Sequence, residues 1–453
     1  MSIAANEDLP IAVLGAGPVG LAAAAHLHAR GLRALVLEAG GVVGSSVREW
    51  GHVRLFSPWR YLVDPAAKSL LESHGWRPPD PDAHPTGAEL VTGYLKPLAA
   101  TPEIGPMLRF GHRVTAVTRV GYDRLKTGGR ERAPFLVVAE APQGQVRLKV
   151  RSVIDATGTW MTPNPLGAGG VHAAGEAENA GHVRYGVPDV LGCERERYAA
   201  RRTLVVGSGH SAFNAVIDLA ALAEEVPGTQ VLWAVRRREP GQMFGGGDDD
   251  ALPERGALGE RARALVARRG VELLPGFFVD RLDQTEDGLA VVAADGRRLV
   301  IDEVVAATGF RPDLEMTREL RLDLDPITEA PVRLAPLIDP NVHSCGTVPP
   351  HGEAELAHPE PGYYAVGMKS YGRAPTFLML TGYEQVRSVV AFLAGDVAAA
   401  RRVELVLPET GVCSSNLPGT DAACCGPQIA ADASGSEDRH EHEIPVLAGG
   451  CCG

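Results

Sequence analysis

Two short apolar runs, each followed by glycines and a longer apolar segment, give the chain a repeated pattern. Ile11–Leu14 and Thr203–Val206 lack the polar–apolar alternation of a half-exposed strand, so they predict strands buried on both faces. Leu21–Ala29 predicts a helix after the first run, and Ala34–Leu37 predicts a second strand. Gln230–Val235 predicts the matching strand of the second unit. The pattern therefore predicts two α/β units.

The first apolar run leads into Gly15-Ala16-Gly17-Pro18-Val19-Gly20, which has the spacing of a dinucleotide-binding fingerprint. Gly15 permits a tight turn, Gly17 lets the backbone approach a pyrophosphate, and Gly20 lets the helix pack closely on the strand. The helix then points its N-terminal amides at the phosphates. Glu38 ends the second strand, at the spacing expected for the carboxylate that binds a ribose hydroxyl.

A second fingerprint runs from Gly207 to Ala212, with alanine as a variant of the third glycine. The strand that follows ends in three arginines instead of an acid. Arginine binds a 2′-phosphate bidentately, so the pattern favours NADPH over NADH; a solvated basic run at a strand end is the alternative. The residues expected to bind the second cofactor are Gly207, Gly209, Ser211, Arg236 and Arg237.

Each unit closes on an Ala-Thr-Gly marker, at Ala156–Gly158 and Ala307–Gly309. Phe135–Glu140 and Gln145–Ile154 predict two strands that lead into the first marker. We therefore expect an α/β fold with two Rossmann-like dinucleotide-binding domains and a flexible C-terminal tail. We expect a first domain in two parts, at residues 1–165 and 311–400, and a second domain at residues 200–310. A cysteine-rich tail follows at residues 408–453.

The composition limits the classes of partner that the protein is expected to bind. The chain has 453 residues, and its net charge of −12 argues against a nucleic-acid partner, which needs a basic face. No apolar run reaches membrane-spanning length, and no basic region precedes the first apolar run as in a signal peptide. We expect a soluble cytoplasmic protein that binds no nucleic acid and no membrane.

Five of the seven cysteines lie in the expected tail, and four of them form adjacent pairs. Adjacent thiols can form a strained, easily reduced disulfide, and thiolates are soft ligands for a metal or metalloid. The alternative is a tail whose thiols have no specific role. The tentative metalloid ligands are Cys413, Cys424, Cys425, Cys451 and Cys452.

The paired fingerprints, the paired markers and the late segment Gly362–Gly367 resemble the flavoproteins with two dinucleotide-binding domains. Ala307–Asp313 is similar to a segment of the flavin-containing monooxygenases, and the whole chain looks like the monooxygenase-like proteins of actinobacterial arsenic-resistance clusters. The resemblance implies FAD on the first fingerprint, NADPH on the second, and cofactor contacts at Gly158, Gly309 and Gly367. A homodimer is the usual assembly in these proteins.

The chain departs from both branches of this superfamily. Residues 30–65 contain no cysteine, so the thiol pair that the dithiol reductases place beside FAD is absent. The monooxygenase motif between the two domains has no matching phenylalanine in Gly175–Pro188.

Candidates for a catalytic role are Trp50, His52 and Lys369. Lys369 follows Gly367 and could add positive charge near the flavin, or be a solvated lysine. Trp50, Phe56, Trp59 and Tyr61 could line a pocket, although aromatic residues this close in sequence more often belong to a core. The sequence predicts a helix beginning near Pro375, because proline suits the first helical position. The resemblance implies that the N-terminus of this helix faces the flavin. His351 and His358 predict loop surface or, less favoured, a metal site.

Three functions stay open from the sequence. The leading one is an NADPH- and FAD-dependent monooxygenase-like enzyme that acts on an arsenical or another small molecule with molecular oxygen. The second is an NADPH-dependent disulfide or metalloid reductase whose electrons reach the tail thiols. The third is a non-catalytic metalloid-binding or redox-sensing flavoprotein.

Overall fold

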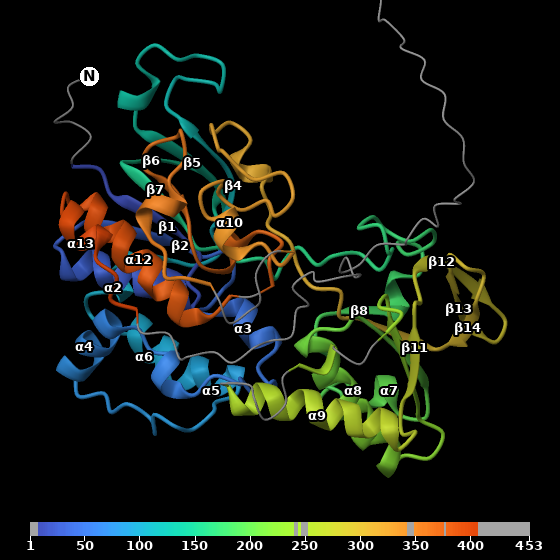
Figure 1. The fold of residues 1–453 in the computed structure, drawn as a ribbon. Coiled ribbons are helices and arrows are strands. Elements are labelled where there is room, and N and C mark those ends of the chain that lie inside the picture. The colour runs from blue at the N-terminus through green and yellow to red at the C-terminus, as the bar shows by residue number, and fades with distance from the viewer. Residues whose placement is uncertain (1–7, 240–242, 246–251, 342–347, 376, 406–453) are drawn as a thin grey trace, which may run out of the picture.

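A computed structural model describes residues 8–239, 243–245, 252–341, 348–375 and 377–405. Two lobes stand side by side, and each is built on a five-stranded parallel sheet with helices against it (Figure 1). The five tail cysteines lie outside the described residues. Within the described part of the chain, no helix is long and apolar enough to cross a membrane.

The first sheet has the strand order β16-β7-β1-β2-β3, with every neighbouring pair parallel. Its fingerprint strand β1 is fully buried, as the unbroken apolar run predicts. The strand β16 joins the edge of this sheet from a position more than 200 residues later in the chain. The five strands are β1 (Ile11–Leu14), β2 (Ala34–Leu37), β3 (Leu108–Arg109), β7 (Ser152–Asp155) and β16 (Tyr363–Ala365).

Helices from both ends of the described chain cover the first sheet. The α2 helix begins at Pro18, three residues before the predicted start, and α12 packs against it. The α12 helix begins at Met379 instead of near Pro375. The helices of this lobe are α2 (Pro18–Ala29), α3 (Ser45–Glu49), α4 (Pro65–Ser73), α5 (Gly87–Leu90), α6 (Lys96–Ala99), α10 (Ala335–Ile338), α11 (Glu353–Leu356), α12 (Met379–Leu393) and α13 (Val397–Arg401).

An antiparallel meander of β4 (Arg113–Arg119), β5 (Phe135–Ala141) and β6 (Gly144–Val150) precedes the first marker. The single strand expected over residues 145–154 is wrong: it is two strands, β6 and β7, which break at Arg151. Burial explains the break, because β6 is mostly solvent-facing whereas β7 is buried throughout and belongs to the parallel sheet.

The second lobe repeats this plan. Its parallel sheet has the order β11-β10-β9-β15-β8, and the meander β12-β13-β14 precedes the second marker. The strand β8 lies between the first marker and β9 in the chain and forms one edge of this sheet. The strands are β8 (Val183–Tyr185), β9 (Arg202–Val206), β10 (Gln230–Val235), β11 (Glu272–Pro275), β12 (Val279–Thr285), β13 (Gly288–Ala293), β14 (Arg298–Ile301) and β15 (Glu303–Ala306).

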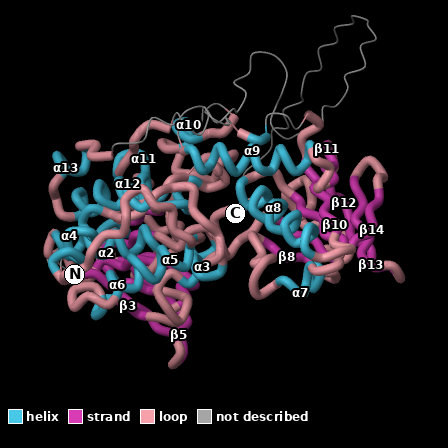
Figure 2. Tube along the Cα trace, turned by 90° about the horizontal axis from the view of Figure 1, so that it is seen from below, coloured by secondary structure: helices cyan, strands magenta, loops and turns pink. Residues whose placement is uncertain are grey.

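The helices of the second lobe are α7 (Arg195–Tyr198), α8 (His210–Glu225) and α9 (Pro253–Ala267). The view from below shows β10–β14 and α7–α9 grouped apart from α2–α6 and α12 (Figure 2). In both lobes the fingerprint strand pairs with the marker strand, β1 with β7 and β9 with β15. Both cofactor motifs therefore lie at the carboxyl edge of a parallel sheet, where such folds bind ligands.

Candidate cofactor and active site

The first fingerprint is closed toward the protein and open on its other side. Gly15 has φ +96°, and a Cβ there would lie 2.8 Å from the Ala156 carbonyl oxygen. A Cβ on Gly20 would lie 2.0 Å from the Gly15 carbonyl oxygen. By contrast, a Cβ on Gly17 or Gly158 would meet no atom of the described residues within 4 Å. The open positions are those where a dinucleotide must approach the backbone, so the cradle fits a pyrophosphate.

Glu38 lies at the mouth of this cradle. Its two carboxylate oxygens accept hydrogen bonds from the backbone N–H groups of Ala16 and Gly40, each at 2.7 Å. The backbone thus fixes the carboxylate beside the fingerprint, where it can accept a hydrogen bond from a ribose hydroxyl.

Lys369 is buried beneath the first marker. Its Nζ lies 2.7 Å from the Asp155 carboxylate and 3.1 Å from the Thr157 hydroxyl oxygen, and its side chain is 1% exposed. The alternative of a solvated lysine is therefore wrong. Asp155 and Tyr363 are not among the residues expected from the sequence, and the Tyr363 hydroxyl donates to the same carboxylate at 2.8 Å. The available signal was an acidic residue directly after the apolar pair Val153-Ile154 and directly before the first marker.

Gly367 starts the turn that carries Lys369, and a buried polar network holds this turn. The Gln385 side chain accepts a hydrogen bond from the Gly367 N–H at 2.7 Å and donates to the Ser370 hydroxyl at 2.9 Å. The Gln385 amide also contacts the His351 ring at 2.9 Å. Burial lowers the pKa of His351, so its neutral form is favoured.

His351 and His358 are both buried, so the expectation of loop surface is wrong. Burial lowers the pKa of His358 to about 4. Among the described residues, no group of three or more histidine, cysteine or acidic residues has the arrangement of a metal site.

The second fingerprint has the same closed and open positions as the first. A Cβ on Gly207, which has φ +136°, would lie 2.1 Å from the Ala307 carbonyl oxygen. One on Gly209 would meet no atom within 4 Å in the part of the chain that the structure describes. Ser211 lies in the first turn of α8, and Ala212 is buried behind it. Gly309 has φ +86° and is exposed. This site also fits a dinucleotide.

Arg236 and Arg237 follow β10 at the edge of the second site. Arg236 is exposed and donates a hydrogen bond to the Ala168 carbonyl oxygen at 3.2 Å. Arg237 is half-buried, and its carbonyl accepts a hydrogen bond from the Gly276 N–H. Both arginines thus lie at the strand end where the ribose of a second dinucleotide is expected.

The aromatic side chains within residues 50–59 of the first lobe do not line one wall of a pocket together. Trp59 is buried in the hydrophobic core of that lobe, in line with the alternative that these aromatic residues belong to a core. Trp50 packs against Gly87, where an added Cβ would lie 2.8 Å from its ring. Phe56 instead reaches the second lobe, with its ring centroid 5.2 Å from that of His210 in the first turn of α8.

His52 also faces the second lobe. Its Nε2 is buried and has no hydrogen-bond partner among the described residues. Burial raises the pKa of the Asp218 carboxyl on α8, and the charge of His52 opposes that shift. The structure thus brings His52 to the junction of the lobes and leaves Lys369 beneath the first marker.

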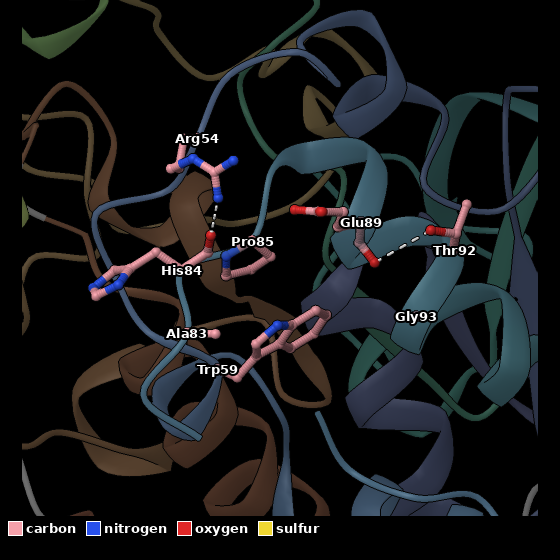
Figure 3. A pocket seen from close by; sticks show the side chains of 8 residues that line it. All are labelled: Arg54, Trp59, Ala83, His84, Pro85, Glu89, Thr92 and Gly93. Atoms are coloured by element: carbon pink, nitrogen blue, oxygen red, sulfur yellow. Dashed lines mark hydrogen bonds between the residues drawn. The ribbon is translucent and has the colours of Figure 1, made fainter. Parts of the chain in front are cut away.

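A shallow groove of about 320 Å³ lies elsewhere in the first lobe (Figure 3). Arg54 lines one side of the groove and donates a hydrogen bond to the His84 carbonyl oxygen. This groove lies on the insertion between β2 and β3 and contains neither fingerprint. Its lining residues are Arg54, Trp59, Ala83, His84, Pro85, Glu89, Thr92 and Gly93.

The sequence patterns of two known families match the segments that contain these two sites. The sequence pattern of the pyridine nucleotide-disulphide oxidoreductases matches residues 103–348, more than half of the chain. The chain belongs to this family. The pattern of an NAD(P)-binding Rossmann-like domain matches residues 13–73. Members of the family are oxidoreductases, so the protein is an enzyme of that class and the non-catalytic alternative is set aside.

Curated relatives include flavin-containing monooxygenases. The chain is 26% identical over 240 residues to flavin-containing monooxygenase FMO GS-OX-like 2 of Arabidopsis thaliana, which covers 48% of both chains. It is 30% identical over 216 residues to indole-3-pyruvate monooxygenase YUCCA1 of Oryza sativa subsp. japonica, which covers 46% of this chain and 44% of the relative. The chain thus spans about half the length of these relatives.

Solved structures show the same fold. A bacillithiol disulfide reductase from Bacillus cereus superposes with a TM-score of 0.62 at 19% identity, over 85% of this chain and 99% of the other. A flavin monooxygenase mutant from Stenotrophomonas maltophilia gives a TM-score of 0.57 at 21% identity, over 85% and 98%. The matched families are described by a pyridine nucleotide and by NAD(P) binding, so the expected FAD with an NAD(P) cofactor is confirmed, and the choice of NADPH stays a prediction.

Proposed function

We propose that the protein is an NADPH-dependent FAD enzyme of the monooxygenase-like kind. The observation that carries this proposal is the pair of cradles at Gly15–Gly20 and Gly207–Ala212. Each is closed by a marker carbonyl and open at its middle glycine. When bound, the two cofactors supply hydride transfer from the nicotinamide to the flavin.

The chain's own residues bind and orient these groups. The first turn of α2 presents N–H groups to the FAD pyrophosphate, and Glu38 holds the ribose. Gly158 lets the backbone come close to the same cofactor, whereas the Cβ position of Gly367 faces the Val19 side chain in the first turn of α2, at 3.2 Å. The turn that carries Gly367 is held rigidly by Gln385, which accepts a hydrogen bond from the Gly367 N–H.

NADPH is proposed for the second cradle because of Arg236 and Arg237. The substitution Arg236→Ala with Arg237→Ala removes both guanidinium groups that can pair with a 2′-phosphate. We expect KM for NADPH to rise by roughly tenfold or more while KM for NADH changes little. Steady-state oxidation of both nucleotides measures this. Arg281→Ala removes an exposed arginine of the second meander that pairs with Asp283, and serves as the matched control.

Oxygen is the proposed electron acceptor, and an arsenical or an arsenic–thiol adduct is the proposed substrate. The monooxygenase relatives support oxygen as the acceptor. The arsenical substrate is supported only by the sequence resemblance to proteins of arsenic-resistance clusters. The test is to reduce the purified flavoprotein with NADPH without air and then to follow oxygen uptake with and without trivalent arsenicals. We expect the arsenical to raise NADPH oxidation without release of an equal amount of hydrogen peroxide. Equal peroxide release under all conditions would contradict it.

A disulfide or metalloid reductase is the second proposal, and the paired tail cysteines favour it. Removal of residues 408–453 separates the two. The reductase predicts that NADPH still bleaches the flavin but that disulfide or metalloid reduction stops. The monooxygenase predicts that oxygen-dependent turnover survives the truncation.

A further inference from the structure

Trp160 lies where the two lobes meet, two residues after the first marker. Its ring stacks on Phe310, which directly follows the second marker, with centroids 4.8 Å apart and planes inclined by 30°. Its indole Nε1 donates a hydrogen bond to the Glu49 carboxylate at 2.7 Å. Glu49 ends α3, which follows the fingerprint of the first lobe. One side chain thus contacts elements from both cofactor sites.

The backbone beside Trp160 is tied to the second marker. The Asn164 N–H donates to the Gly309 carbonyl oxygen at 2.9 Å, and the Arg311 N–H donates to the Thr162 carbonyl oxygen at 3.0 Å. The Thr308 hydroxyl donates to the Asn164 carbonyl oxygen at 2.5 Å. These bonds join residues 162–164 to residues 308–311. We call these two hydrogen-bonded segments the marker clamp.

Gly186 shows how closely the indole fits at this point. A Cβ on Gly186 would lie 2.9 Å from the Trp160 ring, so a larger residue would displace the ring. The Gly186 N–H donates to the Ala306 carbonyl oxygen at the end of β15. The indole is therefore confined on one face by the backbone of the second lobe.

We propose that Trp160 is a positioning residue that sets the approach of the nicotinamide dinucleotide to the flavin by fixing one marker against the other. This rests on the proposed two-cofactor function. Hydride transfer requires the reacting atoms to be within a few tenths of an ångström of a productive distance, and a displacement of about 1 Å can cost roughly 10²-fold in rate. A flat, rigid side chain anchored at both ends is suited to that task.

Residue 160 can be substituted to test this proposal without unfolding the protein. Trp160 and Phe310 belong to none of the four main hydrophobic core clusters formed by the described residues. Trp160→Leu removes both the stacked ring and the N–H donor, whereas Trp160→Phe keeps a smaller aromatic ring and loses the donor. Trp76→Phe is the matched control, because it loses an equivalent bond from the Trp76 indole to the Gly93 carbonyl oxygen within the first lobe.

The first measurement is the rate of flavin bleaching by NADPH in an anaerobic stopped-flow experiment, together with flavin content and melting temperature. We expect Trp160→Leu to slow bleaching by roughly 10²-fold with flavin content and melting temperature unchanged. Trp160→Phe should recover a large part of the rate, and Trp76→Phe should match the parent protein. An unchanged rate in Trp160→Leu overturns the proposal, as does a loss that follows flavin release or melting temperature.

The second measurement does not depend on cofactor chemistry. Hydrogen exchange followed by mass spectrometry reports the marker-clamp amides of Asn164 and Arg311. We expect Trp160→Leu to speed their exchange while the amides of β1 and β9 stay protected. If NADPH fails to bleach the parent flavin but the clamp still loosens in Trp160→Leu, the proposed function fails, whereas the part of the proposal in which Trp160 fixes one marker against the other stands. Unchanged clamp exchange overturns the role.

Discussion

The two lobes share a fingerprint, a meander and a marker, but what holds each marker differs. In the first lobe, Asp155 precedes the marker and is buried against Lys369. In the second lobe, Ala306 occupies the equivalent position. The hydroxyl of Thr157 donates to Asp155 of its own strand, at 2.7 Å. The equivalent hydroxyl in the second lobe bonds to Asn164 instead.

The comparison shows that one sequence motif can be fixed in two ways. The first marker is held from within its own lobe by a buried ion pair that also ties the returning chain to the sheet. The second marker is held by the chain that enters from the first lobe. The second cofactor site therefore depends on the connection between lobes, whereas the first depends on burial of charge.

The largest expected effect comes from breaking the buried pair. Lys369→Met leaves the Asp155 carboxylate buried without its cation, and we expect the free energy of unfolding to fall by about 3–5 kcal/mol. Urea unfolding monitored by circular dichroism measures this. Adding Asp155→Asn should recover a large part of the loss. Lys68→Met, which removes an exposed lysine paired with Glu72, should change stability by less than about 0.5 kcal/mol.

The next largest loss of stability is expected at the third glycine position of the fingerprints, which is Gly20 in the first lobe and Ala212 in the second. Gly20→Ala places a Cβ 2.0 Å from the Gly15 carbonyl oxygen, so we expect a loss of about 3 kcal/mol and poor retention of flavin. The reverse change in the second lobe, Ala212→Gly, should cost only about 1 kcal/mol, the helix-propensity difference. Thermal unfolding and the ratio of bound flavin to protein measure both. Equal losses would show that the two fingerprints are packed alike.

Acid should weaken the first lobe before the second. The pKa of His358 is lowered by burial to about 4, so as pH falls below 6.5 the unfolded chain gains a proton that the folded chain does not. The stability that this neutral histidine supplies is complete above pH 6.5 and declines as pH approaches 4, by about 2 kcal/mol between pH 7 and pH 5. In the second lobe, burial raises the pKa of Asp218 and of Glu303, which favours protonation there.

Hydrogen exchange of each lobe at pH 7 and pH 5 measures this difference. His358→Gln should flatten the pH dependence of the first lobe, and His84→Gln, a half-exposed histidine of the same lobe, should not. Faster exchange in the second lobe first would contradict the expected order.

The sequence predicted the parts of the fold that follow from local pattern. The strands over residues 11–14 and 34–37, and the closed and open glycines, depend on periodicity and on backbone conformation, which nearby residues determine. The single strand over residues 145–154 was wrong because its two halves belong to different sheets, and local pattern does not report sheet membership.

The site was predictable only where its chemistry is local. Lys369 could be suspected but not placed, because its partner Asp155 is more than 200 residues away in the chain. Trp160 was not selected because its role depends on Phe310 and Glu49, which only the three-dimensional arrangement brings together. The tail cysteines lie outside the described residues, so their metalloid-binding role stays a prediction.

The placement of β16 has a consequence for how the protein is made on the ribosome. The first sheet lacks its edge strand, and Asp155 lacks Lys369, until synthesis has passed residue 369. The strands β8–β15 are contiguous in the chain between residues 183 and 306, so the second lobe can complete its sheet earlier. Although its first strand emerges first, the N-terminal lobe is therefore the last to close, and its exposed sheet edge is a target for chaperones during synthesis.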